Sequence, residues 1–183
     1  MHVSTVSPTP ALLLNHVFAL SVLQAVTVAE GTPVKTFVLN AFRPADCLPY
    51  DTYSESLPLF LKANAHALSC VQQLELRLGI FDRYAMCWGM DWEHVDSAFT
   101  ILRDNSPALK VTLRLTFVSH DGNTDPHEED LQSIAEIVED LNEEMRAYLL
   151  PSALAAGLPV RLIVRLYQPG QSESDAEEQS LWL

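Results

Sequence analysis

Glycine and cysteine are both scarce in this chain of 183 residues. It has 6 glycines, and neither a GxGxxG nor a GxxxxGK[ST] loop is present, so a nucleotide site built on a glycine-rich loop has no support. Cys47, Cys70 and Cys87 form no CxxC pair and no even-numbered disulfide framework. We expect three reduced, buried thiols, which indicates a cytoplasmic or nuclear protein.

Positive charge is also in short supply. Lys and Arg together number 11 against 24 Asp and Glu, which gives a formal net charge of −13. Such a charge argues against nonspecific binding to nucleic acid or to an anionic membrane. The composition is 48% hydrophobic and 19% charged, which excludes a disordered acidic chain. The chain is long enough to bury a core without a metal or a disulfide.

The most apolar stretch covers residues 11–29. The first basic residue of the chain, Lys35, comes after this stretch, and Asn15, His16 and Gln24 interrupt it. A signal peptide or a membrane-spanning helix is therefore disfavoured. We expect a buried or half-buried helix at the start of the domain.

Four segments alternate apolar and polar residues with the period of two that is typical of strands. They cover residues 34–42, 71–81, 109–118 and 160–167. Three further helices are expected over residues 54–69, 92–103 and 126–150. For the second, Asp91 is the expected N-cap and Ser106-Pro107 the stop; for the third, Asp125 and Glu128 form the expected capping box. A short turn over residues 152–156 should end at Gly157.

Helices and strands therefore alternate along the chain. Strict alternation predicts an α/β fold with a mainly parallel sheet. We assign residues 1–168 to a single α/β repeat-like domain. Residues 169–183 carry an acidic tail that we expect to be disordered.

Two groups of residues are candidates for a site. The loop and helix start that contain His120, Asp121, Asp125, His127, Glu128 and Glu129 could suit a metal, but carboxylates are expected in the first turn of any helix, and we expect no metal. Tyr84, Trp88 and Trp92 gather after the second strand and are tentative binding residues. The competing interpretation is that Trp92 fastens the following helix to the core. No GxSxG elbow or other catalytic constellation is found, so we expect neither an enzyme nor a cofactor.

Three stretches resemble the C-terminal, leucine-rich-repeat-like region of fungal F-box proteins, especially the large mushroom families. The first is LELRLGIFDRYAMCWGMDW. The second is a helix–strand unit whose matching positions are Trp92, Val95, Asp96, Phe99, Pro107, Leu109, Thr112, Leu113 and Phe117. The third is LLPSALAAGLPVRLIVRL, with Leu150, Pro151, Leu154, Gly157, Leu158 and Val160 in the pattern. Thr112 departs from the usual aliphatic residue, the glycine falls one residue early, and the likeness covers residues 70–167.

This resemblance implies a leucine-rich-repeat-like solenoid piece. It would act as a noncatalytic protein-interaction module, like the substrate-recognition region of a ubiquitin-ligase receptor, and its partner would be another protein. Nothing in residues 1–69 matches the Leu-Pro-x-Glu-like opening of an F-box, so binding to the Skp adaptor is not expected. The alternative is a small α/β ligand-binding or enzymatic domain with its site in the loops after the strands, at residues 43–53, 82–90 and 119–124.

Overall fold

The computed structural model describes residues 11–15, 35–40, 56–65, 68, 71–80, 90–118, 133–167 and 176–183. Their strands are β1 (Ala11–Asn15), β2 (Thr36–Asn40), β3 (Gln73–Ile80), β4 (Lys110–Val118), β5 (Val160–Tyr167) and β6 (Glu177–Trp182). They form one sheet in the order β1-β2-β3-β4-β5-β6. The first five strands are parallel and β6 is antiparallel to β5. The expected α/β class with a mainly parallel sheet is thereby confirmed.

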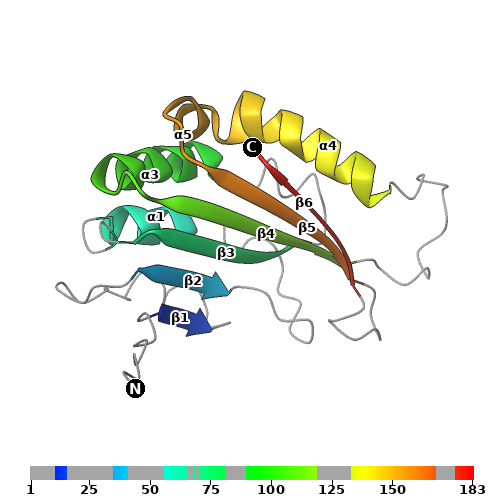
Figure 1. The fold of residues 1–183 in the computed structure, drawn as a ribbon, viewed down its shortest axis with the longest axis horizontal. Helices are drawn as coiled ribbons and strands as arrows, with labels where there is room; N and C mark the ends of the chain where they lie inside the picture. Colours follow the sequence, from blue (N-terminus) through cyan, green and yellow to red (C-terminus); the bar gives the residue numbers. More distant parts are fainter. Residues whose placement is uncertain are drawn as a thin grey trace, which may run out of the picture.

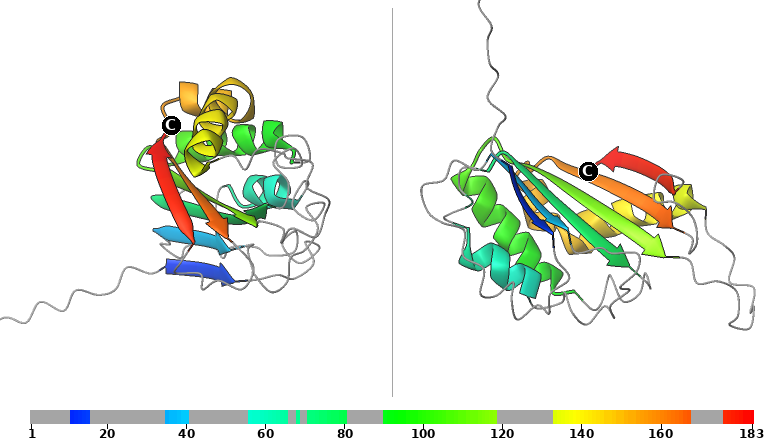
Figure 2. Two further views of the ribbon diagram at one scale, coloured as in Figure 1. Left: turned by 90° about the vertical axis from the view of Figure 1, so that its right-hand side faces the viewer. Right: turned by 90° about the horizontal axis from the view of Figure 1, so that it is seen from below.

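The helices of the described part all cover one face of the sheet (Figures 1 and 2). They are α1 (Ser56–Ala63), α3 (Trp92–Asn105), α4 (Ile134–Glu144) and α5 (Pro151–Ala155). A π-helical turn, Met145–Leu149, joins α4 to the segment before α5. The left view of Figure 2 shows the sheet edge-on, with the described helices on one side of it and none of them on the opposite side.

The hydrophobic core lies between the sheet and this helical layer. Leu76 of β3 and Leu113 of β4 are register partners and are 1% and 0% exposed, respectively. Val95 and Phe99 of α3 are one helical turn apart and belong to the same buried cluster. At the β2 side, the rings of Phe37 and Phe60 stack with their centroids 5.7 Å apart. The apolar residues that alternate along the strands and those on one face of each helix thus pack into one core, as the sequence pattern predicts.

Helix α3 begins and ends where its sequence predicts. The Asp91 side chain accepts a hydrogen bond from the backbone N–H of His94, which would otherwise be an orphan donor of the first turn. At the other end, the Ser106 hydroxyl donates to the carbonyl of Val71, 2.8 Å away, and so fixes the helix end to the entry of β3. The short helix α5 is likewise followed by Gly157, whose φ of 74° only glycine adopts without strain.

The expected start of the long helix is wrong. Helix α4 begins at Ile134 rather than at residue 126, because Ser133 is extended and acts as its N-cap. Ser133 and Glu136 form a complete capping box, with the Ser133 hydroxyl accepting from the Glu136 N–H and the Glu136 carboxylate accepting from the Ser133 N–H. The box expected at Asp125 and Glu128 lies outside the described residues.

Both ends of the chain also differ from expectation. The apolar stretch near the start contributes β1, parallel to β2, rather than a helix over residues 11–15. A short apolar run fits a buried parallel strand as well as a helix, so its periodicity could not distinguish them. Residues 177–182, expected to be disordered, form β6, whose Leu181 packs against the core. None of the described helices is long and apolar enough to cross a membrane.

Candidate functional site

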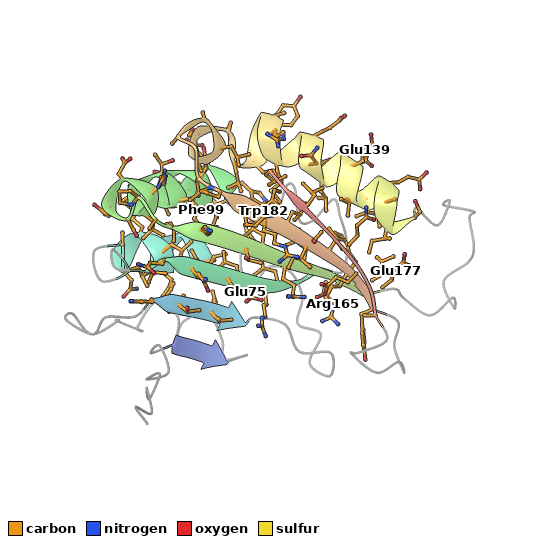
Figure 3. The ribbon with its side chains drawn as sticks, viewed as in Figure 1. Glu75, Phe99, Glu139, Arg165, Glu177 and Trp182 are labelled. Atoms are coloured by element: carbon orange, nitrogen blue, oxygen red, sulfur yellow. The ribbon has the colours of Figure 1, made fainter. Side chains whose placement is uncertain are left out.

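The face of the sheet opposite the helices carries charged and polar side chains. We call it the open face and define it by the positions that alternate with the core leucines: Gln73, Glu75 and Arg77 of β3, Lys110, Thr112, Arg114 and Thr116 of β4, Arg161, Ile163 and Arg165 of β5, and Glu178, Ser180 and Trp182 of β6. Two of these side chains, Thr116 and Ile163, are themselves buried. The parallel registers of β3, β4 and β5 place these positions side by side, with neighbouring strands about 4.8 Å apart. Figure 3 views the sheet from this side, with Glu75, Arg165 and Trp182 labelled.

Cationic groups are concentrated on the open face. Five of the 11 Lys and Arg residues of the chain lie there: Arg77, Lys110, Arg114, Arg161 and Arg165. They face two carboxylates on the same surface, Glu75 and Glu178. The open face is therefore locally positive on a protein whose formal net charge is −13.

Ion pairs join four successive strands across this surface. The Glu75 Oε1 atom lies 2.8 Å from Arg77 Nε and 3.3 Å from Arg114 Nε. The Nη1 atom of Arg114 also lies 2.6 Å from Glu178 Oε2. That same oxygen is 3.3 Å from Arg165 Nε, so Glu178 connects β6 to β4 and β5. These ion pairs hold the charged side chains in defined positions. A surface whose side chains are already ordered loses less conformational entropy when a partner binds.

The pKa of Glu75 reports the strength of this surrounding positive charge. Partial burial would raise the pKa, but the hydrogen bonds and charges of Arg77 and then of Arg114 outweigh it. The net effect is a pKa below the ordinary value of 4.5. Glu75 therefore remains ionised at neutral pH while only 23% of its side chain is exposed.

One corner of the open face differs from its centre, where the arginines are paired with Glu75 and Glu178. Lys110 and Arg161 form no ion pair with a carboxylate among the residues that the structure describes, and Arg161 Nη2 donates to the Ser180 hydroxyl at 3.1 Å. Trp182 is the register partner of Arg161 and is 57% exposed. We call Lys110, Arg161 and Trp182 the Lys110–Trp182 corner.

The aromatic site expected from the sequence is only partly described. Tyr84 and Trp88 lie outside the described residues. Trp92 is the first residue of α3, is 4% exposed and belongs to the hydrophobic core cluster. This burial agrees with the interpretation of Trp92 as a packing residue. The possible metal loop, with His120, Asp121, Asp125, His127, Glu128 and Glu129, also lies outside the described residues.

The buried Asp96 has two hydrogen-bond donors from a segment that is distant in sequence. Its carboxylate is 6% exposed and accepts hydrogen bonds from the backbone N–H groups of Ser152 at 3.0 Å and Ala153 at 2.8 Å. These are orphan donors of the first turn of α5. Asp96 therefore acts as a distant cap that fastens α5 to α3, which is a packing task rather than a catalytic one.

Sequence reasoning noted the outward polar residues of the strands but did not treat them as a site. The signal was available in the alternation of β4, where Thr112 and Arg114 separate the buried residues Val111, Leu113 and Leu115. It is weak in isolation because any half-exposed strand has polar outward positions. Only the strand order shows that Arg77, Arg114 and Arg165 share one surface. Comparison of the chain with protein-family models, curated proteins and solved structures found no match.

Proposed function

We propose that this chain is a noncatalytic protein-interaction module, a leucine-rich-repeat-like solenoid piece that binds a partner protein through its open face. The observation that carries the proposal is the strand order, which follows the chain order while every described helix lies on one side. Stacked repeats build a sheet in this way, and their exposed sheet surface is available to a partner. A doubly wound fold would instead reverse its strand order and place helices on both faces.

The repetition of side chains supports the same proposal. Arg77 and Arg114 occupy equivalent register positions on β3 and β4, each two residues beyond Glu75 or Thr112. At this register position β5 carries the buried Ile163 instead, and its outward cations are Arg161 and Arg165. Protein interfaces are enriched in arginine and tryptophan, and the open face offers both.

The resemblance to the repeat region of fungal F-box proteins suggests what such a module does. It would recognise a target protein, as the substrate-recognition region of a ubiquitin-ligase receptor does, while an F-box would have to come from elsewhere. The strand β2 supports this division of labour, because it is hydrogen-bonded to β1 on one side and to β3 on the other. Its release to form a helical F-box would expose paired backbone groups.

Site-specific photocrosslinking tests the proposed function. A photoreactive residue at Gln73 would stand exposed on the sheet, and the same residue at Ser97 would stand exposed on α3 in the helical layer. We expect Gln73 to capture one and the same protein in repeated experiments in cells, and the purified protein to bind the unmodified chain. Capture of that protein from Ser97 alone would overturn the assignment of the open face. A chain that captures no protein but binds a small molecule would favour the alternative of a ligand-binding or enzymatic domain.

A further inference from the structure

We propose that the Lys110–Trp182 corner binds an extended acidic segment of the partner protein. This inference rests on the proposed function and adds the chemistry of the partner. It is carried by two cations that have no carboxylate among the described residues, beside an exposed tryptophan.

The registers bring the three side chains together. Thr112 is the register partner of Arg161, and Lys110 lies two residues before Thr112 on the same side of β4, which places Lys110 diagonally opposite Arg161. Trp182 lies directly across from Arg161 on the other side, in β6. Three neighbouring strands therefore present a lysine, an arginine and an indole next to one another. Neighbouring strands are about 4.8 Å apart and alternate residues about 6.6 Å apart, so one extended peptide can reach all three.

The cations of this corner differ from the other cations of the open face in their pairing with carboxylates. Arg77, Arg114 and Arg165 each have a carboxylate within 3.3 Å, provided by Glu75 or Glu178. Lys110 is exposed, and Arg161 is exposed with a serine hydroxyl as its partner. Within the described part of the chain, these two positive charges are therefore not neutralised by a carboxylate. Screening limits such attraction to about 8 Å at physiological salt, so the local charge matters more here than the net charge of −13.

The molecule itself illustrates how this face holds an acidic strand. β6 is an extended segment, and its Glu178 carboxylate reaches Arg114 at 2.6 Å and Arg165 at 3.3 Å. The partner of the corner would repeat this contact with its own carboxylates, on Lys110 and Arg161. Trp182 would add an apolar contact beside the two charges. Tryptophan and arginine are both enriched among the residues that contribute most to binding at protein interfaces.

A nucleic acid is a weaker fit than a polypeptide. Its continuous phosphates would extend beyond the two cations of the corner and meet Glu75, Glu178 and a strongly acidic protein. An extended peptide instead directs alternate side chains to the same side, about 6.6 Å apart, and so can place carboxylates only where cations stand.

Fluorescence anisotropy with a defined probe tests this inference. The probe is a fluorescein-labelled peptide in which glutamate and threonine alternate, and a peptide with glutamine in place of glutamate is its control. We expect binding of the acidic peptide that weakens as salt is raised. The Lys110→Glu/Arg161→Glu variant should lose about tenfold or more in affinity. The matched variant Lys62→Glu/Arg146→Glu has the same charge change on exposed residues of the helical side and should bind as the wild type does.

The second variant, Lys110→Gln/Arg161→Gln, removes the charges without adding repulsion and should give an intermediate loss if the fold is intact by circular dichroism. Trp182→Ala should weaken binding at unchanged charge. Equal binding by both charge-reversed variants would overturn the corner as the site. Tighter binding of an oligouridylate than of the acidic peptide would assign the corner to nucleic acid. Failure of the peptide to bind while Gln73 still captures a protein would overturn this inference alone and leave the proposed function standing.

Discussion

The carboxylate of Asp96 in α3 accepts a hydrogen bond from the backbone N–H of Ala153 in α5, at 2.8 Å and 57 residues further along the chain. Ser152 donates to the other oxygen. A helix of five residues has little stability of its own, and its first N–H groups need acceptors. Asp96 supplies an acceptor to each of two such N–H groups from a neighbouring helix, and so holds α5 in place together with the buried Leu150 and Ala153.

Asp96→Ala should therefore lower the free energy of unfolding by about 2 to 3 kcal/mol, because one buried and one partly buried backbone N–H group lose their acceptor. Chemical denaturation measures the loss. Ser97→Ala, at an exposed neighbouring position of the same helix, is the control and should stay within about 0.5 kcal/mol. An Asp96→Ala variant as stable as this control would show that the hydrogen bonds contribute nothing to stability.

Leu113→Ala tests the centre of the core. The side chain is fully buried on the helix-covered face of β4, so its truncation should cost about 2 to 5 kcal/mol of unfolding free energy. Thr112→Ala, the adjacent residue on the open face, should cost less than about 1 kcal/mol. A loss below about half a kcal/mol for Leu113→Ala would contradict the facing of this strand.

Trp92 should behave as a packing residue in solution. In a Trp88→Phe/Trp182→Phe background it is the one remaining tryptophan, and its fluorescence should be protected from acrylamide because the ring is 4% exposed. Trp92→Ala should destabilise the protein by about 3 to 5 kcal/mol. Free quenching together with unchanged stability would restore Trp92 as a binding anchor.

The lowered pKa of Glu75 gives a pH dependence with a definite sign. The folded state holds this carboxyl in its ionised form more strongly than the unfolded state does, so its contribution is present above the ordinary pKa of 4.5. The contribution disappears as the pH falls through the lower, folded-state pKa. The stability difference between wild type and Glu75→Gln should thus be about 1 kcal/mol or less at pH 7 and shrink below pH 4.5.

Urea unfolding of both proteins across that pH range measures this difference. Glu139→Gln removes an exposed carboxylate of α4 and controls for the simple loss of one negative charge. A difference between wild type and Glu75→Gln that grows as the pH falls would have the wrong sign and would contradict the lowered pKa.

The chain should not bind the Skp adaptor. Adaptor docking needs a compact helical F-box, whereas β2 is paired on both sides within the sheet. Isothermal titration of the purified chain with the adaptor should give no heat of binding. Micromolar or tighter binding would mean that an F-box activity is present after all.

The sequence predicted correctly those elements that have a long hydrophobic periodicity and a capping or helix-breaking residue at their ends. β5 occupies residues 160–167 as expected, since its alternation is bounded by Gly157-Leu158-Pro159. Helix α3 has both its Asp91 cap and its Ser106 end. The start of α4 was misplaced because Asp125-Pro126 and Ser133 both precede capping glutamates, and local pattern does not rank one box above another.

The open face could not be predicted because it depends on which strands are neighbours. Arg77 and Arg114 are 37 residues apart in sequence, and no local pattern says that β3 and β4 pair in register. Glu178 was harder still. Its acidic surroundings indicate a disordered tail by composition. The structure shows instead that its carboxylate pairs with arginines of β4 and β5, while Leu181 of the same strand packs against the core.

The sequential strand order gives the molecule the character of a linear array. Distance along the chain becomes distance across the sheet, so β2 and β5 share no strand boundary and are separated by β3 and β4. The ion pair between Arg114 of β4 and Glu178 of β6 is a contact that reaches past the strand between them. In the repeat architecture proposed above, a duplicated strand-and-helix segment would widen the sheet, and every existing strand pairing but one would be kept.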